Sequence, residues 1–311
     1  MEWPNCKFIA SELALHQLCA IDNNTGRLLG CFPYPLTLTP TAFCRQDNSD
    51  KLCISFKSDS IGNIYIVNTS TMQGYKLPIE IPSPLQFTAT PDLCNSYFTT
   101  PNETLYHLNM TTLELNALAQ PENAFCCGLT VNDQKIFSVW ETTNGHGIVA
   151  IFNKNGELEK EIEIKAIPTN IAIHGSDILI PFSESSDYGE GFAIINHDES
   201  PRYITIHDPA SSYTPSLYPC SITIDDKNNI AYLIHENGGS ISIVDTNNYS
   251  VHNTFSIGRS ISNIYLLPDT RFALATSNMF ADLTLLDLVN HRLLSVNDSS
   301  QEFSNLLTII D

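Results

Sequence analysis

Basic residues are scarce in this chain of 311 residues, which has 15 Lys and Arg against 34 Asp and Glu and a net charge of −19. So negative a field repels phosphate backbones and anionic lipid headgroups, and we expect neither nucleic acid nor a membrane as a partner. Charged residues make up only 16% of the chain and the aromatic content is ordinary, which excludes a solvated disordered chain and a coiled coil. The length accommodates two ordinary domains or one large β architecture.

Long apolar runs are also missing. The first residues include Glu2 and Pro4 and contain no uninterrupted apolar core, so they do not resemble an export signal. No apolar run approaches the roughly 20 residues that span a bilayer. The sequence therefore predicts a cytoplasmic protein, although delivery by another secretion route stays open.

Signatures of catalysis and of cofactor binding are missing as well. The nine cysteines include no CxxC pair, most lie in apolar strand-like runs, and we expect them to be buried and reduced. There is no G-x-S-x-G, and Cys126 and Cys127 have no histidine nearby in sequence. A Gly-rich phosphate-binding turn is likewise absent. We expect no catalytic residue and no cofactor.

One pattern does organise the chain. Residues 240–258 (SISIVDTNNYSVHNTFSIG) read as two alternating apolar strands joined by a polar turn, which predicts an antiparallel hairpin. The same pattern, an apolar strand closed by Asp or Asn, recurs at intervals of 41 to 49 residues, a period typical of four-stranded propeller blades. Its seven anchors are Asp22, Asn68, Asn109, Asn153, Asn196, Asp245 and Asp287.

Two further strand-like runs separate one hairpin from the next, so each period contains four strands and leaves no room for a helix. Before the second blade only three strands are available, and the run EFSNLLTII near the C-terminus supplies the fourth. Pairing the two ends closes a ring and removes the exposed edges of an open sheet. The prediction is a single all-β domain over residues 1–311, a seven-bladed β-propeller of four antiparallel strands per blade.

The hairpin of residues 240–258 and the following run SNIYLLPDTRFALATSN resemble the YVTN-type propeller repeat, over roughly residues 218–288. Thr270 stands where that repeat usually has Gly, and Asn replaces Asp at four anchors. WD repeats fit less well, because neither Trp3 nor Trp140 is followed by Asp. The resemblance implies the fold, and fold alone does not imply function.

Ligands of propellers usually gather where the loops joining second to third strands, and the loops joining blades, surround the central channel. These loops are rich in carboxylates, which can hold a cation, do acid–base chemistry or form a merely solvated acidic rim. The candidate binding residues in them are Glu141, His146, Glu184, Asp187, Tyr188, Glu190, Tyr213, Tyr218, His235, Glu236 and Arg259, and Asp59, Glu103, Asn278 and Asp282 occupy equivalent positions.

Two functions compete. The acidic loops and the tyrosines Tyr213 and Tyr218 favour a non-catalytic, monomeric interaction module that binds a basic protein or peptide. The alternative is a metal-dependent enzyme of the lactonase or lyase type, in which His146 and His235 join the carboxylates around a divalent cation. The sequence leaves the metal question open.

Overall fold

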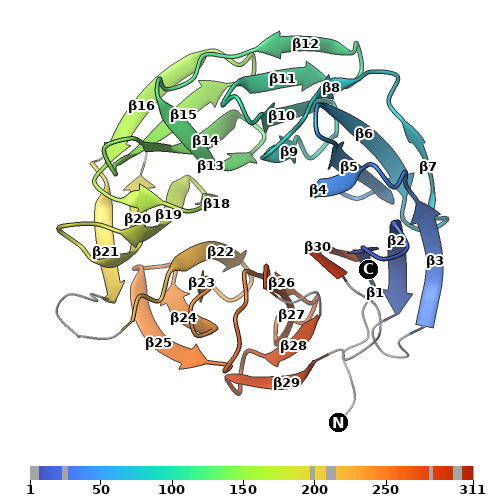
Figure 1. Ribbon diagram of the computed structural model, residues 1–311. Coiled ribbons are helices and arrows are strands. Elements are labelled where there is room, and N and C mark those ends of the chain that lie inside the picture. The colour runs from blue at the N-terminus through green and yellow to red at the C-terminus, as the bar shows by residue number, and fades with distance from the viewer. Residues whose placement is uncertain are drawn as a thin grey trace.

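The computed structural model describes residues 7–22, 27–196, 200–207, 215–279, 283–296 and 303–310. Seven antiparallel sheets stand around a common axis, like the blades of a propeller (Figure 1). The predicted all-β, seven-bladed architecture is therefore confirmed. No helix within the described ranges is long and apolar enough to cross a membrane.

The first four blades, each from its innermost strand outwards, have the following bounds. Blade 1 consists of β30 (Phe303–Ile310), β1 (Lys7–Glu12), β2 (Gln17–Asp22) and β3 (Arg27–Pro33). Blade 2 consists of β4 (Thr39–Arg45), β5 (Lys51–Lys57), β6 (Ile61–Asn68) and β7 (Gln73–Lys76), with β8 (Ile81–Pro82) added on β6. Blade 3 consists of β9 (Phe87–Ala89), β10 (Asn95–Thr99), β11 (Leu105–Asn109) and β12 (Glu114–Ala117). Blade 4 consists of β13 (Ala124–Val131), β14 (Lys135–Thr142), β15 (Gly147–Asn153) and β16 (Leu158–Ile164).

The last three blades complete the ring. Blade 5 has a broken innermost strand, β17 (Ile167–Pro168) and β18 (Ala172–His174), followed by β19 (Asp177–Glu184), β20 (Glu190–Asn196) and β21 (Arg202–His207). Blade 6 consists of β22 (Pro219–Asp225), β23 (Ile230–His235), β24 (Ser240–Asp245) and β25 (Ser250–Ser256). Blade 7 consists of β26 (Asn263–Leu266), β27 (Phe272–Thr276), β28 (Thr284–Asp287) and β29 (Arg292–Val296).

The seven predicted anchors each end the third strand of a blade. The side chains of five of them bond backbone N–H groups of the turn that follows: Asn68, Asn109, Asn153, Asp245 and Asp287. The Asn196 Oδ1 instead is buried without a hydrogen-bond partner. The Asn68 Oδ1 accepts hydrogen bonds from the backbone N–H groups of Ser70 and Thr71, at 3.1 and 2.9 Å. The Asn109 Oδ1 accepts hydrogen bonds from the backbone N–H groups of Thr111 and Thr112 in the same way, both at 2.9 Å. A short Asp or Asn side chain thus closes the turn into the outermost strand. This local hydrogen bonding is what the sequence pattern records.

The ring closes through β30, which pairs with β1 as the sequence predicts (Figure 1). Leu307 packs in the cluster between blades 7 and 1, and Ile310 packs in the cluster between blades 1 and 2. The Arg45 Nη1 of blade 2 donates a hydrogen bond to the Ile309 carbonyl at 3.2 Å. The C-terminal strand therefore joins three blades.

The core consists of seven hydrophobic clusters, one between each pair of neighbouring blades. Each sheet buries both faces, which accounts for the apolar residues at alternate positions on both sides of the strands. Trp140, for example, is fully buried between blades 3 and 4, and its Nε1–H bonds the Ser138 hydroxyl at 2.7 Å. The described cysteines are all free; Cys19 and Cys53 are buried, whereas Cys94 is exposed.

Candidate binding site on the loop face

Antiparallel pairing within the blades divides the loops between two faces of the ring. Loops joining second to third strands, and loops joining consecutive blades, open on one face, which we call the loop face. The two remaining kinds of turn open on the opposite face, which we call the turn face. Most of the predicted binding residues belong to the loop face, so the topology gathers residues that are far apart in sequence.

Five side chains of the loop face lie at or next to the innermost strands, and we call this set the inner rim. It consists of Glu103, Phe125, Glu141, Tyr218 and Glu236. Phe125 belongs to the innermost strand β13, where it lies opposite Glu141 of β14. Glu103 and Glu236 each follow the second strand of a blade, and Tyr218 directly precedes the innermost strand β22. The inner rim thus combines three carboxylates with two aromatic rings.

Tyr218 is held at the rim by a buried carboxylate. Glu190 is only 2% exposed, and it accepts hydrogen bonds from the Ser216 hydroxyl, from the Leu217 N–H at 2.9 Å and from the Tyr218 N–H at 3.4 Å. The Tyr218 carbonyl accepts a bond from the Glu236 N–H at 3.0 Å. Tyr218 has a φ of 56°, a left-handed conformation that is strained for a bulky residue. Several turn residues of this chain, Leu93 and Tyr249 among them, share this conformation, which persists only where the surroundings fix it.

The rim residues lie close enough to act on one another electrostatically. Burial raises the pKa of the Tyr218 hydroxyl, and the negative charges of Glu236 and Glu141 raise it further. Burial and the charges of Glu141 and Glu103 likewise raise the pKa of the Cys127 thiol to about 12. Negative potential from blades 3, 4 and 6 therefore converges on one region. The thiol stays protonated near neutral pH and is a poor nucleophile there.

The carboxylates of the rim are partly exposed and have few partners. The Glu103 Oε2 accepts a hydrogen bond from the Cys126 N–H at 3.0 Å, and the Glu236 Oε1 accepts one from the Asn278 amide at 3.4 Å. Within the described part of the chain, no Lys or Arg forms an ion pair with Glu103, Glu141 or Glu236. The residues Phe125 and Tyr218 are 56% and 41% exposed. The rim thus offers negative charge and open aromatic surface together.

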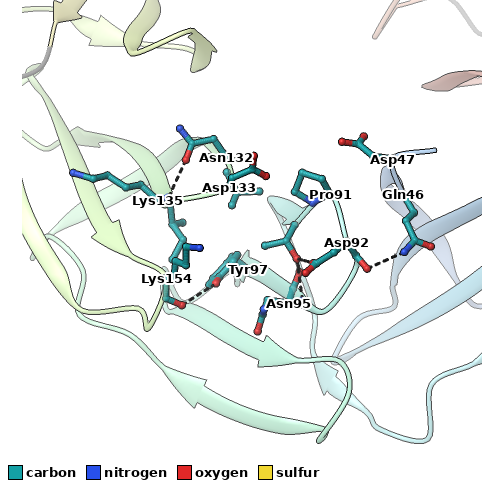
Figure 2. A pocket seen from close by; sticks show the side chains of 13 residues that line it. Gln46, Asp47, Pro91, Asp92, Asn95, Tyr97, Asn132, Asp133, Lys135 and Lys154 are labelled. Atoms are coloured by element: carbon teal, nitrogen blue, oxygen red, sulfur yellow. Dashed lines mark hydrogen bonds between the residues drawn. The ribbon is translucent and has the colours of Figure 1, made fainter. Parts of the chain in front are cut away.

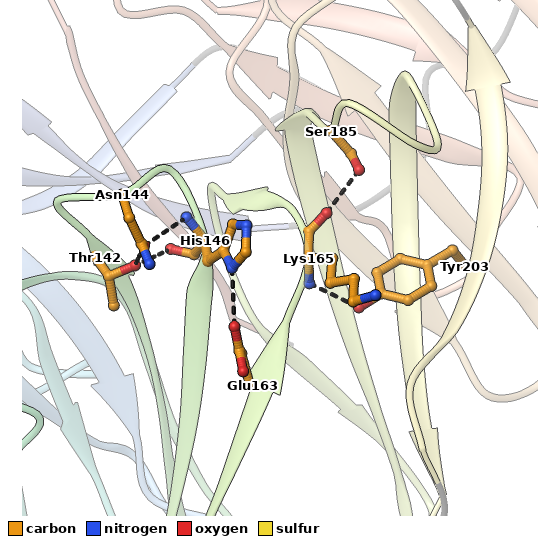
Figure 3. Close-up of polar contacts among 7 residues, drawn as sticks. All are labelled: Thr142, Asn144, His146, Glu163, Lys165, Ser185 and Tyr203. Atoms are coloured by element: carbon orange, nitrogen blue, oxygen red, sulfur yellow. Dashed lines mark hydrogen bonds and ion pairs between the residues drawn. The ribbon is translucent and has the colours of Figure 1, made fainter.

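Blade 5 carries three more predicted residues, which lie in different surroundings. Glu184 and Asp187 are exposed on the loop face. Tyr188 instead stacks on Tyr203 of the outermost strand, with ring centroids 4.1 Å apart and planes 5° from parallel. The Tyr188 ring therefore packs within blade 5 and does not belong to the inner rim. The Tyr203 hydroxyl also accepts a hydrogen bond from the Lys165 N–H at 2.7 Å (Figure 3).

The two histidines that the sequence groups as candidate metal ligands bond different partners in blades 4 and 6. The His146 Nδ1 lies 2.8 Å from Glu163 on the outermost strand of blade 4 (Figure 3). His235 is not exposed in a loop, which corrects the sequence-based placement: it ends β23, is fully buried, and its Nε2 bonds the Ser242 hydroxyl at 2.8 Å. Burial, with a contribution from His207, lowers the pKa of His235 to about 4. Among the described residues, no group of three or more His, Cys, Asp or Glu side chains is arranged to hold a metal ion.

The remaining candidates complete the comparison with the sequence. Glu190 is a buried positioning residue rather than an exposed one, because it binds the chain before β22. Arg259 is half-buried, and its carbonyl lies against Gly239. Tyr213 and Asp282 lie outside the described residues. The sequence did not predict Phe125 as a binding residue, because an aromatic residue in an innermost strand normally indicates a core position.

Solved structures with the same architecture are similar over nearly the whole chain. A functionally unknown protein from Desulfotomaculum acetoxidans has a TM-score of 0.73 and 13% identity, covering 98% of both chains. A protein from Lactobacillus plantarum has a TM-score of 0.70 and 13% identity, covering 99% of this chain and all of the other. Hydrazine synthase from Kuenenia stuttgartiensis has a TM-score of 0.67 and 12% identity, covering 88% and 89%. Likeness at such low identity shows the seven-bladed propeller fold alone.

No protein-family model matches the chain, and no curated protein matches it. The resemblance to YVTN-type repeats therefore stays a prediction. The solved propellers have mixed functions, among them hydrazine synthase and a dihydro-heme d1 dehydrogenase.

Proposed function

We propose that this protein is a non-catalytic binding propeller, with repeats of the YVTN type, that takes a basic segment of a peptide or protein on the inner rim. One arrangement carries the proposal: the buried carboxylate of Glu190 fixes a strained, partly exposed Tyr218 beside carboxylates that have no cationic partner among the described residues. A protein gains no stability from holding negative charges together in this way. A bound cation relieves their mutual repulsion.

The chemistry of the rim suits a Lys or Arg side chain. Its charge would pair with Glu141 or Glu236, and its flat or methylene surface would pack on the rings of Phe125 and Tyr218. Each exposed ion pair contributes about 0.2–1 kcal/mol, and a cation–π contact about 0.5–1 kcal/mol at an exposed site. The net charge of −19 steers basic partners toward the protein over a longer range.

The chemistry of the described residues favours binding over catalysis. The pKa of Cys127 and that of Cys220 are both raised to about 12 by burial and by neighbouring carboxylates, so neither thiol is activated. His146 and His235 each bond a different partner within blades 4 and 6. No observation of this structure specifically favours the lactonase or lyase alternative.

The test is a fluorescence-anisotropy titration with labelled peptides of alternating Arg and Gly-Ser, against peptides in which Glu replaces Arg. We expect saturable binding of the basic peptide only. Tyr218→Ala, Glu141→Gln and Glu236→Gln should each weaken it by about two- to fivefold, with larger losses in combination. Added salt should weaken it further.

Two substitutions on outermost strands, Glu114→Gln and Glu161→Gln, serve as controls because they remove the same charge from exposed positions away from the rim. Rim variants and control variants that lose affinity equally would show that only the overall charge matters. That result, or equal binding of both peptides, would overturn the proposal.

A further inference from the structure

A cavity lies on the turn face, away from the inner rim. It has a volume of about 410 Å³, within the range of small-molecule sites. Its walls come from blades 2, 3 and 4: the loops between β4 and β5, β9 and β10, and β13 and β14, together with the turn after β15. Figure 2 shows these segments meeting around Pro91.

The walls of this cavity are built before any ligand arrives. The Asn132 Oδ1 accepts bonds from two N–H groups of its own loop, at 2.9 Å each. The Gln46 amide donates to the Asp92 carbonyl at 3.1 Å, which joins blades 2 and 3. Tyr97 is almost fully buried, and its hydroxyl donates to the Lys154 carbonyl at 3.4 Å. A preformed site of this kind loses little conformational entropy on binding.

Three charged side chains of the cavity remain uncommitted. Asp47, Asp133 and Lys154 form no side-chain hydrogen bond or ion pair within the described part of the chain. In contrast, Lys135 pairs with Glu159 at 3.0 Å and extends away from the other labelled side chains in Figure 2. In that view Asp47 and Asp133 stand on either side of Pro91. Asp92, a third carboxylate of the wall, is committed to its own loop, because its Oδ1 accepts hydrogen bonds from the Thr90 hydroxyl at 2.5 Å and from the Cys94 N–H at 2.9 Å. The carboxylates of Asp47 and Asp133 and the ammonium group of Lys154 therefore remain for a ligand.

We propose that this cavity binds a free α-amino acid with a cationic side chain, of the arginine, lysine or ornithine class. Such a molecule carries two cationic groups and one carboxylate, which match Asp47, Asp133 and Lys154 in number and in sign. A neutral amino acid would leave one carboxylate unpaired, and an acidic one would be repelled by the pair. The site is independent of the peptide-binding function of the inner rim.

The test is isothermal titration of the full chain with L-arginine, L-citrulline and agmatine. Citrulline is a neutral counterpart of arginine, and agmatine lacks the carboxylate. We expect one saturable site for L-arginine, and affinities for the other two lower by about tenfold, the equivalent of one lost charge-assisted contact. Asp47→Asn, Asp133→Asn and Lys154→Met should weaken arginine binding by a similar factor. All three residues are exposed, so the variants should keep the wild-type melting temperature.

Asp226→Asn provides the matched control, because Asp226 occupies the same kind of turn in blade 6 and does not line the cavity. It should bind arginine like the wild type. Absence of saturable binding of L-arginine at concentrations up to about 10 mM would overturn the proposal, because a weaker affinity is negligible. Binding of agmatine as tight as that of L-arginine would also overturn it. Arginine binding that is lost in Tyr218→Ala but retained in Asp133→Asn would place the ligand at the inner rim and also overturn it.

Discussion

Removal of residues 303–311 should destroy the ring as a cooperative unit. Residues 303–310 of this segment form the innermost strand of blade 1, and its loss leaves the inner edge of β1 without a partner. Leu307 and Ile310 are 3% and 6% exposed and belong to two different clusters between blades. Truncating one buried Leu or Ile to Ala typically costs about 2–5 kcal/mol. The loss of both side chains and of a strand ladder is therefore comparable to the entire stability of a domain, about 5–15 kcal/mol.

Urea and thermal unfolding, followed by circular dichroism, measure this effect. We expect the truncated protein to lack the cooperative transition of the wild type. The milder variant Leu307→Ala should unfold cooperatively, with a free energy of unfolding lower by about 2–5 kcal/mol. Leu36→Ala, at a side chain that is 76% exposed, should change stability by less than about 0.5 kcal/mol.

A synthetic peptide of residues 303–311 supplies a stricter test, because it can pair with β1 of the truncated protein from outside. We expect it to restore the cooperative transition, and the same peptide with Leu307→Lys to fail. A truncated protein that unfolds at the wild-type temperature without any peptide would refute the closure as a source of stability.

Two further substitutions test local features of the fold. At Gly239 an added Cβ would lie 1.4 Å from the Arg259 carbonyl oxygen, so Gly239→Ala should displace the loop before blade 7 and lower the melting temperature strongly. Gly238→Ala is the control: nothing lies within 4 Å of its Cβ, and the free energy of unfolding should fall by only about 1 kcal/mol. Because burial lowers the pKa of His235 to about 4, the unfolded chain takes up a proton near pH 6.5 that the native state refuses. Stability should thus fall as the pH drops from about 6.5 to 4, and His235→Gln should reduce this fall by up to about 3 kcal/mol in urea titrations at several pH values.

The architecture can be predicted from the sequence, because the signals of a propeller blade are local. An Asp or Asn that closes a turn acts on N–H groups two or three residues away, so Asn68 and Asn109 mark the ends of third strands without any tertiary information. Alternating apolar residues mark strands for the same reason. The missing strand at one end and the surplus strand at the other then require closure, and β30 provides it.

Tertiary structure alone decided which loop residues meet and which are exposed. His235 and Glu236 are neighbours in sequence, yet His235 is fully buried inside its blade whereas Glu236 is partly exposed at the inner rim. A bulge in β22 opposite the end of β23 alters the local register, and this cannot be read from composition.

The two proposed sites illustrate the same limit. The inner rim contains Phe125 of blade 4 and Tyr218 next to blade 6, and the cavity of the turn face contains Asp47 of blade 2 and Lys154 of blade 4. The repeat pattern of the sequence does not indicate that these residues share a site. Closing the ring brings these residues together, and packing between blades decides which of their side chains stay in water. Both depend on contacts between segments far apart in the chain, which is the physical reason that the sequence predicts the blades but not the sites.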